Sequence, residues 1–228
     1  LMMVSNEHPD VLERLVPDPK LEAKVKLGAK MLSNASLMRV HSKAGTDLMI
    51  DVTDTRGAGV WGYCDRPGAV AHWPGGLVLC FPKAQRVNGT LVMDAGDINL
   101  TFKRYLESPI RLNIVDDYVT DIEGSGLDAE LLRSYIDAWG DAEAYAVSHV
   151  GWGMNPAARW DALAMYDKCD INGTEFRSFA GNFLYSTGAN EVAKRHTLGH
   201  FDLPIRNCTI ELDDNVVVRD GKLQGDLN

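Results

Sequence analysis

The hydrophobic period of this chain changes near residue 36, and that change constrains the fold more than any other feature. Over residues 7–33 the apolar side chains recur at helical spacing, with a break at Pro17 and Pro19. From about Met38 the apolar side chains alternate with polar ones, as they do in strands that bury one face. The sequence therefore predicts a short helical segment followed by a strand-rich region.

The strand-rich region is divided by residues that favour tight turns. Two predicted strands surround the turn at 44–46, and the Asn88-Gly89 pair is typical of a two-residue hairpin turn. Further apolar runs predict strands at 77–81, 90–93, 110–115, 118–122, 145–150, 205–212 and 216–218. The last two runs predict a hairpin that closes the chain.

Helices are few beyond residue 36. Helical spacing returns over 127–139 and over 157–166, and the first helix of the chain is expected to begin with His8 as cap and Pro9 as its first residue. Because helices and strands do not alternate regularly, the pattern indicates an α+β fold with mixed sheets. We interpret residues 1–35 as the tail of another element, packed on a domain of residues 36–228.

Charge and cysteine content narrow the class of protein. Acidic residues outnumber basic ones by 32 to 23, for a formal net charge of −9, without a basic cluster. This balance argues against a nucleic-acid groove or an anionic membrane surface as partner. The four cysteines are far apart, no apolar run is long enough to span a membrane, and the first residues lack a secretory signal. We therefore expect a soluble, cytoplasmic protein.

The segment Gly199-His200-Phe201-Asp202 carries the most suggestive local chemistry. In an extended segment residues i and i+2 point the same way, so His200 and Asp202 can share one metal ion. One further histidine would complete the two-histidine, one-carboxylate set of non-haem Fe(II) oxygenases. His8-Pro9-Asp10 has the same spacing, so a pair of surface residues without function is the plain alternative.

His149 stands at the end of an apolar strand, directly before the glycine-rich turn at 151–156. Functional side chains often occupy such strand ends, because a rigid element delivers them to a loop-lined cleft. A core histidine bonded to a main-chain carbonyl is the alternative.

His72 and Arg159 are weaker candidates. His72 lies between two Pro/Gly turns, which suits an imidazole at a pocket rim that moves protons near neutral pH. The alternative is a loop histidine without a role. Arg159 and the adjacent Trp160 would line a pocket for an aromatic anion, or would be a surface cation and a core anchor.

Taken in their order along the chain, the segments that contain His72, His149 and His200 resemble the catalytic domain of the 2,5-dihydroxypyridine 5,6-dioxygenases. This family is related to the M29-type metalloaminopeptidases. The resemblance covers roughly residues 36–228 and rests most firmly on the Gly-x-Gly-x-Asn-Pro turn at 151–156 and on the His-x-Asp pair. It implies that residues 1–35 are the remnant of an N-terminal α/β domain. It also implies assembly into a homo-oligomer.

The sequence departs from the peptidase branch at the metal ligands. Ala69 and Leu184 stand where that branch carries a glutamate and a histidine, and His149 replaces a second glutamate. Two neighbouring metal ions need clustered carboxylates to offset their charge, and these are missing. The resemblance therefore implies a single divalent ion held by His149, His200 and Asp202, with positions left for substrate and O₂.

The function that the resemblance implies is an Fe(II)-dependent ring-cleaving dioxygenase. Its expected substrates are 2,5-dihydroxypyridine and O₂, and its product is N-formylmaleamate, a step in the degradation of nicotinate or related N-heterocycles. His72 is the expected catalytic proton carrier, and the expected substrate-binding residues are Ser186, Tyr185 and Arg159. An M29-type metalloaminopeptidase and a non-catalytic metal-binding domain remain the alternatives.

Overall fold

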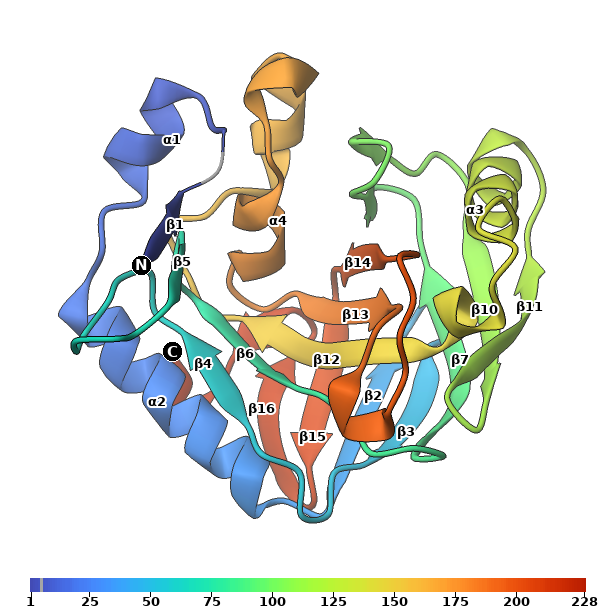
Figure 1. Ribbon diagram of the computed structural model, residues 1–228, viewed down its shortest axis with the longest axis horizontal. Helices are drawn as coiled ribbons and strands as arrows, with labels where there is room; N and C mark the ends of the chain where they lie inside the picture. Colours follow the sequence, from blue (N-terminus) through green and yellow to red (C-terminus); the bar gives the residue numbers. More distant parts are fainter. Residues whose placement is uncertain (5) are drawn as a thin grey trace.

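The computed structural model describes residues 1–4 and 6–228 and is dominated by two β-sheets (Figure 1). The larger sheet has eight strands, in the spatial order β11 (Tyr118–Glu123), β10 (Ile110–Val115), β7 (Val87–Met93), β3 (Asp47–Asp51), β2 (Leu37–Ser42), β15 (Cys208–Leu212), β16 (Asn215–Arg219) and β17 (Lys222–Leu223). The smaller has five, in the order β14 (Phe201–Ile205), β13 (Phe183–Thr187), β12 (Val147–Gly153), β6 (Leu77–Cys80) and β4 (Ala58–Val60). In Figure 1 the strands of the two sheets run in clearly different directions.

Two small sheets and several helices complete the fold. The small sheets pair β1 (Met2–Val4) with β5 (Ala71–Trp73) and β8 (Ile98–Asn99) with β9 (Arg104–Tyr105). The α-helices are α1 (Pro9–Arg14), α2 (Pro19–Asn34), α3 (Leu127–Asp137) and α4 (Thr174–Ser178). The 3₁₀ turns are η1 (Ala142–Tyr145), η2 (Trp160–Ala164), η3 (Lys168–Asp170), η4 (Glu191–Ala193) and η5 (Gly225–Leu227).

The main hydrophobic core lies between the two large sheets and beneath α2. Strand alternation builds it, because every second side chain of β2 and β3 is buried whereas the residues between them face outward. The helix α2 buries Val25 and Leu32 in the same core and packs on β4 and β6. A Cβ atom on Gly28 would come within 2.9 Å of Val78, so glycine permits this close approach of helix and sheet. The domain boundary near residue 36 stays a prediction.

The structure confirms the predicted α+β class and most predicted elements. His8 caps α1 through its side chain and Pro9 is the first helical residue. The predicted hairpin near the end of the chain is formed by β15 and β16. Within the described residues, no helix is both long enough and apolar enough to cross a membrane. The four cysteines are free.

Two sequence predictions were wrong. Asn88 and Gly89 form no hairpin turn but belong to β7, where Gly89 lies opposite Leu48 of β3. Gly89 has a φ of 128° and a Cβ atom there would lie 2.3 Å from the Asp47 carbonyl oxygen, so glycine serves a close strand approach rather than a turn. The helix expected over 157–166 is only the 3₁₀ turn η2.

Candidate functional site

The candidate site lies on the five-stranded sheet where β12, β13 and β14 run side by side. The register between β12 and β13 shifts between Val147 and Val150, so that Ser148 and His149 together oppose Ser186. Such a β-bulge places an extra residue in one strand and re-aims its side chains. Here the bulge turns His149 towards Ser186, and no local sequence signal marks it.

The structure brings the three predicted metal ligands together. His149 Nε2 lies 3.6 Å from Asp202 Oδ1, and His200 Nε2 lies 3.2 Å from Asp202 Oδ2. The two imidazole rings are nearly parallel, with centroids 5.8 Å apart and an interplanar angle of 26°. Ser186 connects His149 with Asp202, because its hydroxyl lies 3.0 Å from His149 Nε2 and donates to Asp202 Oδ1.

Two further groups hold these side chains, and sequence analysis did not predict either. Arg177 of α4 donates from Nε to Asp202 Oδ2 at 2.6 Å. The carbonyl oxygen of Thr187 lies 2.8 Å from His200 Nδ1. The five-residue helix α4 is too short to show helical periodicity, and a main-chain acceptor has no sequence signature.

Burial and neighbouring charges shift the pKa values of the three side chains. Burial lowers the pKa of His149 to about 4, against the opposing attraction of Asp202. The hydrogen bond to Asp202 raises the pKa of His200. Burial alone would raise the pKa of Asp202, but the hydrogen bond from His200 and the charge of Arg177 lower it well below its usual range. His149 is therefore neutral and Asp202 ionised near neutral pH.

The chemistry of this donor set fits a divalent metal ion. A neutral imidazole and an ionised carboxylate are the forms that coordinate metals. Two ligand atoms each about 2.1 Å from one ion and at right angles lie about 3 Å apart, close to the distances from Asp202 to His149 and to His200. As they stand, however, no three His, Cys, Asp or Glu side chains among the described residues surround a common metal position. His200 contacts Asp202 directly, and His149 is connected to Asp202 through Ser186. The three side chains are thus neighbours, but they are not arranged around one metal position.

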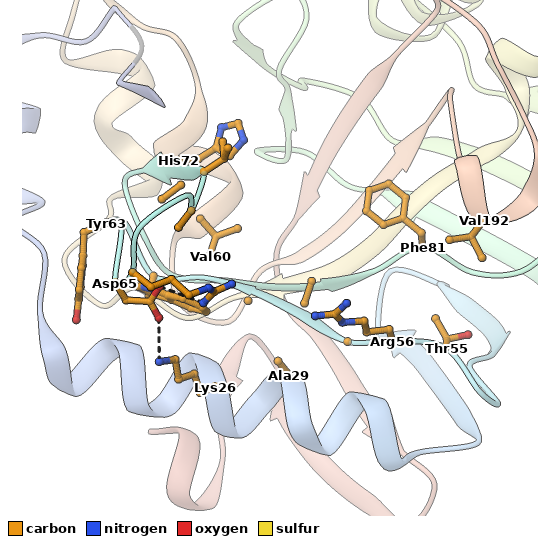
Figure 2. A pocket seen from close by; sticks show the side chains of 18 of the residues that line it. Lys26, Ala29, Thr55, Arg56, Val60, Tyr63, Asp65, His72, Phe81 and Val192 are labelled. Atoms are coloured by element: carbon orange, nitrogen blue, oxygen red, sulfur yellow. Dashed lines mark hydrogen bonds and ion pairs between the residues drawn. The ribbon is translucent and has the colours of Figure 1, made fainter. Parts of the chain in front are cut away.

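A cavity of about 720 Å³ reaches Phe81, the neighbour of His149, although His149, His200 and Asp202 are not among the residues that line it. The rings of Phe81 and His149 are 5.4 Å apart, and Phe81 and Val192 line one end of the cavity. Figure 2 shows His72 towards the other end of the cavity, and Lys26 lines the side of the cavity that is formed by α2. The cavity thus extends from the ring beside His149 to the predicted proton carrier.

The remaining predicted site residues are placed differently. His72 lies on β5, is exposed, and has no hydrogen bond to any other described side chain. Tyr185 is fully buried in the main core, because neighbours in a strand point to opposite faces and Ser186 takes the site face. Arg159 pairs with Asp161 through two hydrogen bonds of 2.8 and 2.6 Å. Of the predicted substrate-binding residues, only Ser186 has a hydrogen-bond contact with predicted ligands, namely His149 and Asp202.

The predicted glycine-rich turn directly after His149 is wrong in its position: Gly151 and Gly153 lie within β12, so His149 stands inside this strand rather than at its end. A Cβ atom on Gly151 would lie 2.0 Å from the Val78 carbonyl oxygen, and one on Gly153 equally close, at 2.0 Å, to the Phe179 carbonyl oxygen. Asn155 donates to the Gly75 carbonyl oxygen at 2.9 Å. These residues therefore allow β12 to pack closely against its neighbours, which fixes the strand that carries His149.

The chain is similar to known proteins over nearly its whole length. A curated 2,5-dihydroxypyridine 5,6-dioxygenase of Pseudomonas putida strain KT2440 is 41% identical over 222 residues, which are 96% of this chain and 63% of the relative. A solved structure of 2,5-dihydroxypyridine dioxygenase from the same strain matches with a TM-score of 0.93 at 39% identity, covering 98% of this chain and 65% of that chain. The chain thus spans less than two thirds of the length of these relatives.

A more distant likeness concerns the fold alone. Wild-type AmpT from Thermus thermophilus matches with a TM-score of 0.67 at 15% identity, covering 95% of this chain and 58% of that chain.

The family described as NicX, 2,5-dihydroxypyridine 5,6-dioxygenase, matches residues 1–225. The chain belongs to the 2,5-dihydroxypyridine 5,6-dioxygenase family.

Proposed function

We propose that this protein is an Fe(II)-dependent dioxygenase that opens the ring of 2,5-dihydroxypyridine between C5 and C6. Both atoms of O₂ enter the product, N-formylmaleamate. Family membership supports the reaction, and one observation carries the assignment of residues: His149 of β12 lies beside Asp202 of β14 and His200, which directly precedes β14. Such a reaction belongs to the breakdown of nicotinate or a related N-heterocycle.

In this proposal His149, His200 and Asp202 hold the ferrous ion. When bound, the ion supplies the redox chemistry and positions for a ring hydroxyl and O₂. The groups around it keep His149 and Asp202 in the coordinating form and orient His200. Burial keeps His149 neutral, Arg177 keeps Asp202 ionised, and the Thr187 carbonyl accepts from His200 Nδ1, which directs Nε2 towards Asp202.

The cavity beside Phe81 is the proposed binding place of the aromatic ring. A volume of about 720 Å³ exceeds what one pyridine ring needs, and the apolar side chains of Phe81 and Val192 at the end near His149 suit a flat aromatic molecule. His72, which lines the same cavity and is exposed, is the proposed acceptor of the proton from a ring hydroxyl. Tyr185 and Arg159 have no part in this proposal, because their side chains are placed elsewhere.

The test of the reaction is anaerobic loading with Fe(II), followed by measurement of O₂ uptake with dihydroxypyridines. Hydrolysis of aminoacyl p-nitroanilides is measured in parallel, because the fold is also that of AmpT. Consumption of equal amounts of O₂ and 2,5-dihydroxypyridine supports the proposal. Hydrolysis without O₂ uptake supports a metalloaminopeptidase, and tight metal binding with neither activity supports a non-catalytic metal-binding domain.

The role of His72 has its own test. His72→Ala is expected to retain Fe(II) while slowing ring opening, because the substrate hydroxyl loses its proton acceptor. The pH profile of the rate should change as well. An unchanged rate and pH profile would contradict the proton-transfer role.

We also propose that the protein is cytoplasmic and acts as a homo-oligomer. Analytical ultracentrifugation tests the oligomeric state.

A further inference from the structure

The two proposed histidine ligands have hydrogen-bond partners of different kinds. His200 Nδ1 lies 2.8 Å from the Thr187 carbonyl oxygen, an acceptor that belongs to the main chain and persists in any side-chain variant. His149 Nδ1 lies 3.3 Å from the hydroxyl of Ser148. At Nδ1, the contact of His149 therefore depends on one replaceable side chain.

The β-bulge makes this contact possible. In a regular strand, Ser148 and His149 would point to opposite faces of the sheet. Because both oppose Ser186 across the register shift, the Ser148 hydroxyl reaches the imidazole of its own neighbour.

The direction of the hydrogen bond follows from the number of protons. The Ser148 hydroxyl lies 2.6 Å from the Ala189 carbonyl oxygen, which can only accept, so its single proton is used there. Towards His149 the hydroxyl can only accept, so this contact is a hydrogen bond when Nδ1 carries hydrogen. Ser148 is 3% exposed, so bulk water does not replace either partner.

We propose that Ser148 is a positioning residue that favours the His149 tautomer with hydrogen on Nδ1 and so leaves the Nε2 lone pair free to bind the metal ion. Metal-bound imidazoles generally donate their second N–H to such an acceptor, which fixes both tautomer and ring orientation. This inference rests on the proposed function, because it gives His149 Nε2 a metal to bind.

Ser186 offers the competing arrangement. Its hydroxyl lies 3.0 Å from His149 Nε2, and it donates its own proton to Asp202. A ring with hydrogen on Nε2 would donate to Ser186 and would have no lone pair there for a metal. Removal of the Ser148 hydroxyl should therefore shift the ring to this non-binding tautomer.

The experiment measures the tautomer in metal-free protein and the metal affinity separately. With ¹⁵N-labelled histidine, NMR should show His149 shifting from Nδ1–H towards Nε2–H in Ser148→Ala, with a 10- to 100-fold weaker affinity for Fe(II) or Co(II), about the usual loss when such a partner is removed. Ser148→Thr, which keeps a hydroxyl, should retain the wild-type tautomer and affinity. If Ser148→Ala does not fold, the nearly isosteric Ser148→Cys gives the same comparison.

Thr46→Val is the matched control. Thr46 is 2% exposed and its hydroxyl donates to the Val92 carbonyl oxygen at 3.2 Å, so this variant also loses a buried hydroxyl but beside the larger sheet. It should change neither the tautomer nor the affinity. An unchanged His149 tautomer in Ser148→Ala overturns the inference, as does an equal loss of affinity in Thr46→Val. Failure of the wild type to bind either metal overturns the proposed function instead, while the tautomer measurement still decides what Ser148 does.

Discussion

Two buried aspartates of this protein are each paired with an arginine, yet their surroundings differ. Asp117 is 0% exposed and accepts hydrogen bonds from the main-chain N–H groups of Gln85, Arg86 and Val87 as well as from Arg195. Asp202 is 4% exposed and has no main-chain donor among the described residues; its partners are the side chains of Ser186, Arg177 and His200.

This difference distinguishes a structural carboxylate from a reactive one. Asp117 and Arg195 join the start of β7, in the larger sheet, to the start of β12, where Arg195 donates to the Val147 carbonyl oxygen at 2.8 Å. Asp202 instead faces His200, whose side chain is 47% exposed, so a ligand from solvent can reach the group. A strongly perturbed or paired carboxylate is thus a site candidate only when side chains reachable from outside surround it.

The largest effect is expected from His200→Ala. It removes one of the proposed ligands at a partly exposed position, so metal binding and activity should be abolished while the fold is retained. Metal content after Fe(II) loading and the far-UV circular dichroism spectrum check both parts. A fully loaded but inactive variant would contradict the ligand role of His200.

The opposite outcome is expected on the structural side of the comparison. Asp117→Asn breaks a buried ion pair and leaves the Arg195 charge without its partner, which typically costs about 3 to 5 kcal/mol of unfolding free energy. Urea unfolding measures this loss. The fraction that stays folded should bind metal as the wild type does. A selective loss of metal affinity with unchanged stability would remove the distinction between the two aspartates.

A pH effect on stability should separate the two regions further. The folded-state pKa of His149 is lowered to about 4, below the ordinary value of 6.5, so the unfolded chain binds this proton more readily. Its contribution to stability is therefore present above pH 6.5 and is lost as the pH falls towards 4, by about 3 kcal/mol in total. Metal-free wild type and His149→Gln, compared by urea unfolding between pH 4 and 7, should differ in slope. Parallel profiles would show that His149 is not held neutral.

The sequence predicted the participants of the site better than their supports. Period-two alternation located the strands, and the His-x-Asp spacing correctly predicted that His200, which directly precedes β14, lies beside Asp202 of that strand. The same alternation, applied to Tyr185 and Ser186, would have excluded Tyr185 from the site. The bulge at Ser148 and the approach of Arg177 depend on strand register and on a helix of five residues, which are set by tertiary packing rather than by local pattern.

The Asn88-Gly89 pair also shows the limit of prediction from local sequence patterns. Its residues are typical of a hairpin turn, but here Gly89 allows β3 and β7 to approach each other within one sheet. A glycine required for close approach and a glycine required for a turn look alike in a single sequence. Only the pairing of distant strands distinguishes them.

The smallest expected effect sharpens the comparison of the two arginines. Arg177 is partly exposed and donates to Asp202 at 2.6 Å, whereas Arg195 is 5% exposed and bridges the two sheets. Arg177→Gln should therefore change stability little but weaken metal affinity about 10-fold, because Asp202 loses the charge that holds it ionised and in place. Arg177→Lys, which keeps the charge, should recover part of the affinity. Isothermal titration with Co(II) measures both variants, and equal affinities for wild type and Arg177→Gln would show that Ser186 and His200 suffice to position the carboxylate.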